Sequence, residues 1–308
     1  MRVPPPLYML GASLLFALMG VCVKFASAQY GAGEIVLYRS LVGLALMLGA
    51  MRLRGIAWRT PVPGMHFWRS ASGTVALCLW FYAIGVLPLG TAMTLNYTAP
   101  VWIALFLIGG SVLLAEPRAG QPGSPGVDGR LVATVLVGFA GVALVLRPTL
   151  DPQQMWGGVL GLLSGVLSAV AYLQVTALGR AGEPSERVVL YFSAAGVVAG
   201  ALLAAVTGEL HAHTPAGLGW LLAIGALATA AQWLMTRAYA TGATLGIAAL
   251  QYLGIAYAFV FGVWLFDDPV TPQALAGMAL IIGAGVAATL LRARPGRAAR
   301  PDAAPTET

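Results

Sequence analysis

Arg39 is the side chain with the clearest capacity for chemistry, because it carries a charge inside a long apolar segment. It lies about six residues into that segment, which is a depth of roughly 9 Å in an α-helix. An ionised arginine inside a membrane costs about 2.5–3.5 kcal/mol on insertion scales, so such residues usually face a cavity or a partner. The guanidinium could bind the carboxylate or phosphate of a solute. The alternative is an anchor that extends to the outer headgroups.

Lys24, Glu34 and Asp267 are further charged candidates near the ends of apolar segments. Glu34 could pair with Lys24 or with Arg39. Together, Lys24, Glu34 and Arg39 would form a cluster with one excess positive charge, which suits an anionic or zwitterionic solute. The alternative for Lys24 is again an extension to the headgroups.

Pro100 is predicted to interrupt a helix well inside the membrane. Because proline has no N–H, it cannot donate to the carbonyl of Asn96, four residues earlier. That free carbonyl, with the Asn96 side chain and Tyr97, forms a candidate polar site; the alternative is a packing kink. An internal repeat, described below, pairs Pro100 with Tyr252. The second half is therefore expected to lack the kink and to offer the polar atoms of Gln251 and Tyr252.

Aromatic and amide side chains recur along the apolar segments, and such side chains suit a site for an amphipathic metabolite. The alternative is that they form interfacial belts and pack helices. The candidates for substrate binding are Arg39, Trp80, Asn96, Tyr97, Tyr172, Gln174, Gln232, Trp233, Gln251 and Tyr252.

The elements that position these residues follow from the composition. Of 308 residues, 59% are hydrophobic and only 9% are charged, with a mean hydropathy of +0.83. A soluble domain carries about 25% charged residues, so this chain is predicted to be an all-α membrane protein. Spanning helices need roughly 20 apolar residues each. The predicted spans are 7–28, 33–51, 66–87, 90–115, 130–147, 156–179, 186–206, 215–239, 243–266 and 272–291.

The ten predicted spans form two related halves. A shift of 152 residues places Gly73–Pro117 on Gly225–Pro269 without a gap, and a similar shift places Arg39 on Phe192. Because each copy has five spans, the second must enter the membrane from the opposite side. Inverted repeats are characteristic of secondary transporters, with the site between the halves. The predicted organisation is a cytoplasmic tail 1–6, a first repeat 7–147, an outer linker 148–155, a second repeat 156–291 and a basic disordered cytoplasmic tail 292–308.

The distribution of basic residues predicts the orientation. With both termini in the cytoplasm, most of the 17 basic residues, Arg54 and Arg69 among them, lie in cytoplasmic loops and adjoining helix ends. The loop 207–214 carries Glu209, His211 and His213 and is predicted to be a solvated outer loop. The excess of arginine over lysine favours a bacterial source, and hence the bacterial inner membrane.

The segment from Tyr82 to Pro100, together with the Glu116-Pro117 pair that follows the same predicted helix, resembles the EamA-type half of the drug/metabolite transporter superfamily. Ala238-Tyr239, Gln251-Tyr252 and Phe266–Pro269 resemble the second half. Asp267-Asp268 departs from the usual Gly-Glu. The resemblance implies a ten-helix carrier of small metabolites, in many members an exporter, with a central cavity lined by helices 1–4 and 6–9.

Several functions are disfavoured by missing motifs. The sequence has no GxxxxGK[ST] motif for ATP hydrolysis. No carboxylate lies in the middle third of a predicted span, and no Ser–His pair is expected at depth. These absences argue against an intramembrane enzyme and favour downhill or exchange transport, or proton handling by Glu34 or Asp267. We expect no cofactor, no metal and no nucleic-acid partner, since the arginines form no patch.

The sequence therefore predicts a secondary transporter that moves a small organic metabolite by alternating access, with export favoured over import. Its expected partners are the lipid bilayer and a small-molecule substrate, and the oligomeric state is left open. The alternatives are an importer of the same fold, an intramembrane enzyme and a membrane scaffold. Lys24, Glu34, Pro100 and Asp267 are the candidates for gating or coupling.

The predicted orientation can be tested with single cysteines introduced at positions 56 and 211 of a cysteine-free variant. An impermeant thiol reagent added to intact cells should label position 211 and spare position 56, because the loops 52–65, 116–129 and 180–185 are expected in the cytoplasm. Labelling of position 56 with protection of position 211 would reverse the orientation.

Overall fold

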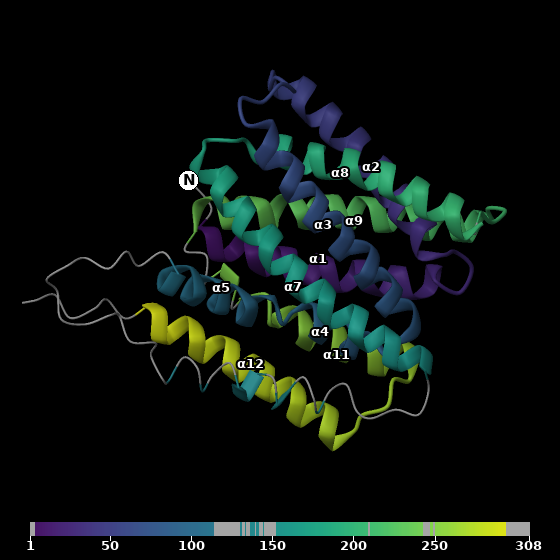
Figure 1. The fold of residues 1–308 in the computed structure, drawn as a ribbon. Coiled ribbons are helices and arrows are strands. Elements are labelled where there is room, and N and C mark those ends of the chain that lie inside the picture. The colour runs from purple at the N-terminus through teal and green to yellow at the C-terminus, as the bar shows by residue number, and fades with distance from the viewer. Residues whose placement is uncertain are drawn as a thin grey trace, which may run out of the picture.

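The structure, a computed structural model, describes residues 4–113, 152–208, 210–242, 247–248 and 250–293, with some positions between 130 and 144. The regular elements of this part of the chain are all α-helices (Figure 1). They are α1 (Pro5–Ala26), α2 (Ala32–Arg54), α3 (Pro63–Val86), α4 (Leu89–Asn96), α5 (Ala99–Leu113), α7 (Pro152–Arg180), α8 (Ser185–Thr207), α9 (Pro215–Thr241), α11 (Leu253–Phe266) and α12 (Pro272–Ala293).

The all-α membrane class is confirmed. Five helices are individually long and apolar enough to cross a membrane, namely α1, α2, α7, α8 and α9, and α11 and α12 contain shorter apolar stretches. The count of ten spans stays a prediction. The loop 116–129 lies outside the described residues, and so do most of the predicted fifth span, residues 148–151 of the predicted linker and residues 294–308. Residues 152–155, predicted as part of the linker, form the start of α7 instead.

The predicted interruption at Pro100 is present as a break between α4 and α5. The chain leaves the helix at Tyr97 and Thr98, and α5 resumes at Ala99. The expectation of an uninterrupted second half was wrong, because the chain also turns at Gln251 and Tyr252 before α11 begins. No proline is needed there, since short-range backbone bonds such as Gly254 N–H to Gln251 O (2.8 Å) close the turn.

The helices pack as a bundle in which elements of the first half lie against elements of the second. α2 packs on α8, α3 on α7 and α1 on α9, while α4 sits between α7 and α11 (Figure 1). α12 lies at the edge of the bundle beside α5. The main apolar core is shared by α1, α3, α4, α7 and α9.

The contact between α2 and α8 is reciprocal. A side chain on Gly43 would collide with Ser193 Oγ, and one on Gly196 would collide with Ser40 Oγ. One shift of the chain pairs Ser40 with Ser193 and Gly43 with Gly196. Reciprocal contacts of this kind are expected when duplicated units are related by a two-fold axis, so they favour the predicted repeat.

α7 approaches the break between α4 and α5 through Gly165. A Cβ at this position would lie 2.5 Å from Thr98 Oγ1 and 2.6 Å from the carbonyl oxygen of Leu95. Only a residue without a side chain permits this approach, because displacing a backbone carbonyl would disturb the break itself. The break is therefore held in place by α7.

Gly165→Ala should destabilise the protein by about 1–3 kcal/mol, as overpacked cores do. Gly219→Ala on α9 is the matched control, because nothing lies within 4 Å of a Cβ there and alanine favours helix. The melting temperatures of the two variants in detergent decide the matter. Equal or higher stability for Gly165→Ala would show that α7 does not constrain the break.

Candidate functional site

A small cavity lies among the helices of the bundle. Its volume is about 40 Å³, and its polar lining comes from helices of both halves. Metabolite sites usually measure about 300–1,000 Å³, so this conformation has room for water only. The polar side chains that line it include Arg39, Arg69, Trp80, Asn96, Tyr172 and Gln232.

Arg39 faces this cavity and does not extend to the membrane surface. Its side chain is buried, with 4% of the residue exposed. The guanidinium carbon lies 5.1 Å from the centre of the Phe192 ring on α8. Arg39 and Phe192 are the two residues that the repeat pairs with each other, and here they are in contact. This burial differs from the extension to the outer headgroups that the interfacial-anchor alternative requires.

Arg69 lines the same cavity, although the sequence predicted it only as one of the basic residues near a cytoplasmic helix end. It is only 2% exposed, and its guanidinium carbon lies 4.4 Å from the Phe192 ring centre. Gly73, one turn along α3, makes room for it, because a side chain there would collide with Arg69 Nη1. Arg39 on α2 and Arg69 on α3 thus approach one aromatic ring.

The unpartnered polar nitrogens around the cavity are all hydrogen-bond donors. Buried atoms with no hydrogen-bond partner among the described residues include Nε of Arg39, Nε and Nη1 of Arg69, Nε1 of Trp80 and Nε2 of Gln232. Each buried, unsatisfied donor costs about 1–3 kcal/mol. The cavity wall therefore holds several unsatisfied donors, and its charged lining residues, Arg39 and Arg69, are both cationic.

The acidic side chains of the described residues lie elsewhere. They are Glu34, Glu183, Glu186, Asp267 and Asp268, and none of them lines the cavity. Each stands at an end of a helix or in a loop. Within the part of the chain that the structure describes, the two arginines therefore have no carboxylate counter-ion.

Asn96 and Tyr172 complete the polar lining. The Asn96 side chain projects from the last residue of α4, and its Nδ2 donates to Ser164 Oγ (3.0 Å) and Ser168 Oγ (3.1 Å) on α7. Tyr172, also on α7, stacks on Tyr239 with ring centres 5.2 Å apart. The break after α4 thus serves to place Asn96 at the cavity wall.

Five of the ten sequence candidates for substrate binding line the cavity: Arg39, Trp80, Asn96, Tyr172 and Gln232. The others do not. Tyr97, Gln251 and Tyr252 are buried at the two helix breaks, Gln174 accepts from Ser72 Oγ, and Trp233 donates to Glu186 at one end of the bundle.

The predicted cluster of Lys24, Glu34 and Arg39 is not formed. Lys24 Nζ donates to Leu87 O (2.8 Å) and lies 3.6 Å from a carboxylate oxygen of Asp268. Asp268 also accepts from Leu89 N–H (2.8 Å). The carboxylate of this corner is therefore Asp268. Asp267 is exposed, and it caps α11 in the left-handed conformation (φ 50°).

Glu34 binds the loop between α8 and α9. This loop, which was predicted to be solvated, is therefore held against α2 by hydrogen bonds. Its carboxylate accepts from His211 N–H (3.2 Å) and lies 2.9 Å from His211 Nδ1. His213 contacts the Tyr38 hydroxyl of α2. We call this end of the bundle, with Lys24–Asp268 and Glu34–His211, the histidine end. Among the described residues, no group of three potential metal ligands occurs.

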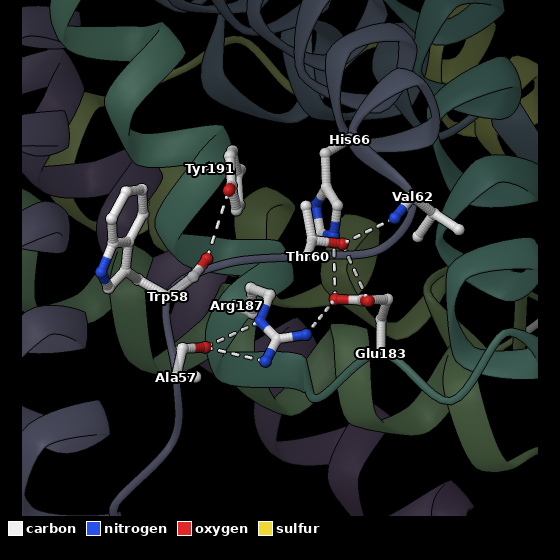
Figure 2. Close-up of polar contacts among 8 residues, drawn as sticks. All are labelled: Ala57, Trp58, Thr60, Val62, His66, Glu183, Arg187 and Tyr191. Atoms are coloured by element: carbon white, nitrogen blue, oxygen red, sulfur yellow. Dashed lines mark hydrogen bonds and ion pairs between the residues drawn. The ribbon is translucent and has the colours of Figure 1, made fainter.

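At the opposite end, a polar cluster centres on Glu183, between α7 and α8 (Figure 2). Its carboxylate accepts from Thr60 Oγ1 (2.9 Å) and Arg187 Nη1 (3.0 Å) and lies 3.0 Å from His66 Nε2. Arg187 also donates to Ala57 O. We call this the arginine end. Its contacts join the α2–α3 loop to the start of α8.

Three further contacts lie at the arginine end. The hydroxyl of Tyr191 donates to Trp58 O (3.2 Å; Figure 2). Glu186 in the first turn of α8 forms an ion pair with Arg54 and accepts from Trp233 Nε1 (3.1 Å). Apart from Glu183–Arg187 and Glu186–Trp233, the contacts named at this end link the first half of the chain to the second.

Residues 4–116 match the model of the EamA-like transporter family. The chain is 32% identical over 283 residues to the pseudopaline exporter CntI of Pseudomonas aeruginosa. The alignment covers 90% of this chain and 92% of the relative. This chain belongs to the EamA-like transporter family, within the drug/metabolite transporter superfamily. It is therefore a membrane transporter and not an enzyme.

Other comparisons agree with this membership. A riboflavin transporter of Vibrio cholerae is 27% identical, with 90% of this chain and 89% of the relative covered. A protein of known crystal structure shares the fold of this EamA-like transporter, with a TM-score of 0.67, 21% identity and coverage of 94% of this chain and 98% of the other.

Sequence reasoning missed Arg69, although a signal for it was present. The repeat pairs Arg69 with Leu221, so the first half of this EamA-like transporter carries a charge where the second half is apolar. The same asymmetry singled out Arg39. Arg69 was overlooked because the positive-inside rule attributes any arginine near a cytoplasmic helix end to the membrane surface.

The pKa of Glu183 lies below the usual range for a glutamate. Burial alone would raise the pKa of this carboxyl, but hydrogen bonds from His66, Thr60 and Arg187 outweigh the burial. The carboxylate therefore stabilises the fold fully above its unfolded pKa of about 4.5. That stabilisation is lost as the pH falls through the lower folded value.

Glu183→Gln should lower the free energy of unfolding by about 1–3 kcal/mol at pH 7, because it removes the negative charge and replaces one of the two acceptor oxygens with an NH2 donor. Tyr191→Phe is the control, since it removes one exposed hydrogen bond of the same region. Melting in detergent from pH 8 to pH 4 provides the measurement. The deficit of Glu183→Gln should shrink as the pH falls below about 4.5, where the lowered pKa of Glu183 no longer stabilises the folded state fully. A deficit that grows between about pH 4.5 and pH 4 would contradict the lowered pKa.

Proposed function

We propose that this EamA-like transporter is a secondary carrier that exports a small organic metabolite with an anionic group. The observation that carries the proposal is the central cavity with Arg39 buried in its wall and no carboxylate near it among the described residues. Such a cavity favours a solute that supplies the missing negative charge. Trp80, Asn96, Tyr172 and Gln232 would contact the rest of the solute.

Alternating access is supported by the polar contacts at both ends. The arginine end is closed by Glu183 and Glu186, and the histidine end by Glu34 and Asp268. Most of these contacts join the first half of the chain to the second. A carrier of this kind opens one end while the other stays shut, so each set of contacts must break in turn.

The membrane arrangement that goes with this function has ten spans in two inverted repeats, with both termini and the arginine end in the bacterial cytoplasm. The reciprocal contacts of α2 and α8 support the repeat. The concentration of arginine at one end supports the orientation.

Export is favoured over import by the 32% identity to the pseudopaline exporter. The riboflavin transporters among the relatives keep the alternative, import of a metabolite or vitamin, in view. The absence of a carboxylate at the cavity among the described residues favours downhill or exchange transport. Any proton handling would fall to Glu34, which has a histidine partner, in preference to the exposed Asp267.

The test is a comparison of intracellular and secreted metabolites in cells with and without the gene. The candidate that accumulates inside the deletion strain is then supplied to proteoliposomes containing the purified protein. Uptake that depends on the protein supports a carrier. Equal metabolite levels in both strains and no protein-dependent flux of the candidate would refute it.

Arg39→Gln should abolish transport of the identified metabolite without loss of folding, because it removes the charge that binds the solute. Arg39→Lys should transport poorly, since lysine lacks the planar two-donor fork of arginine. The exposed Arg59→Gln removes a charge outside the cavity and should behave as wild type. The readouts are initial flux and melting temperature at equal reconstitution. Normal flux in Arg39→Gln would leave Arg39 without a binding role.

A further inference from the structure

Two buried arginines, and not one, face the central cavity. Their number indicates how many anionic groups the substrate carries. Arg39 and Arg69 come from different helices and lie against the same ring of Phe192. We infer that they form a two-point anion site, and that the substrate of the proposed carrier bears two anionic groups, one for each guanidinium. This inference rests on the proposed function and narrows its substrate class.

The burial of both charges is the first argument. Each arginine is at most 4% exposed, and an uncompensated charge at this depth is strongly unfavourable. The two cations also repel each other. A solute with one negative charge would compensate one guanidinium and leave the other uncompensated, whereas a dianion compensates both. The cavity of about 40 Å³ admits too little water to take over that role.

The hydrogen-bonding state of the guanidinium groups is the second argument. Arginines with a purely structural role normally donate to carbonyl or carboxylate oxygens. Here Nε of Arg39 and Nε and Nη1 of Arg69 are buried without a partner among the described residues. The contacts with Phe192 orient the two groups, but they satisfy no N–H.

Gly73 supports the placement of Arg69. A side chain at Gly73 would collide with Arg69 Nη1 and lie 3.1 Å from the Phe192 ring. The guanidinium therefore occupies space that the glycine leaves open. Changing Gly73 displaces Arg69 without removing its charge, which provides a second, independent way to test the site.

The remaining lining indicates the body of the solute. Trp80 Nε1 and Gln232 Nε2 are unpartnered donors, and the rest of the wall is largely apolar. A compact dicarboxylate with a short carbon chain offers acceptors to both arginines and apolar surface to the wall. The shared chemistry is that of two anionic groups on one small molecule.

The experiment measures binding to the purified full-length protein in detergent, by calorimetry and by thermal shift. The probes are succinate, glutarate and adipate, each compared with its own monomethyl ester. The ester keeps the length of the diacid and removes one charge. At least one diacid should bind about tenfold or more tightly than its ester.

The variants then assign the two charges. Arg39→Gln and Arg69→Gln should each reduce the affinity for the preferred diacid to that of its ester, and the double variant should bind neither probe. Gly73→Ala should weaken the diacid more than the ester, because it displaces one of two contacts. Arg59→Gln, which removes an exposed charge, should match the wild type.

The inference is overturned if every diacid binds no better than its ester, or if no probe binds to the wild type. It is also overturned if Arg69→Gln folds normally and keeps the preference for the diacid. None of these results touches the proposed function, whose own test is the metabolite comparison and the flux in proteoliposomes. A carrier that fails here but exports a monoanion or zwitterion would retain its function with a different substrate class.

Discussion

The uncompensated positive charge at the centre of the bundle is the constraint on which the rest of the structure depends. Two guanidinium groups inside a membrane are tolerable only if the surrounding helices keep lipid away and leave room for a counter-ion. The helices of both halves meet around them, and their acidic residues in the described part stand at the two ends. Within the described residues, the ion pairs therefore lie at the two ends, whereas the two central guanidinium groups have no carboxylate partner.

The helix breaks follow from the same constraint. The break ends α4 at Asn96, whose side-chain amide lies at the cavity wall and donates to Ser164 and Ser168 of α7. Backbone outside a helix is tolerated at membrane depth only where protein covers it. Gly165 provides that cover, since α7 touches the carbonyl groups of the break directly.

Hydropathy was sufficient to predict most described helices to within a few residues, because span length is set by the thickness of the bilayer. It could not place Arg69, since an error of a few residues at the start of α3 decides whether that side chain reaches the surface or the cavity. The ion-pair partners of the charged residues could not be predicted from the sequence either. Lys24 and Glu34 lie close in sequence to Arg39, yet their partners are Asp268 and His211, more than a hundred residues away. Asp268, and not the predicted Asp267, contacts Lys24 and Leu89, because the left-handed turn at Asp267 directs the next carboxylate toward them.

The two ends are built from the same chemistry, although they differ in burial. At the histidine end, Glu34 in the first turn of α2 binds His211, just before α9; at the arginine end, Glu183, just before α8, binds His66 in the first turn of α3. The elements correspond if the halves are inverted repeats, because α2 matches α8 and α3 matches α9, although the shift of the repeat pairs none of these four residues with another. The His66 side chain is only 1% exposed and its carboxylate partner has a further cation, Arg187, whereas the His211 side chain is 45% exposed. Water can replace the contacts of His211 more easily than those of His66. The histidine end is consequently the weaker of the two closures. In the proposed carrier, opening the arginine end therefore costs more free energy. Binding of an anion between Arg39 and Arg69 would supply that free energy only if the anion bound the open form more tightly than the closed form.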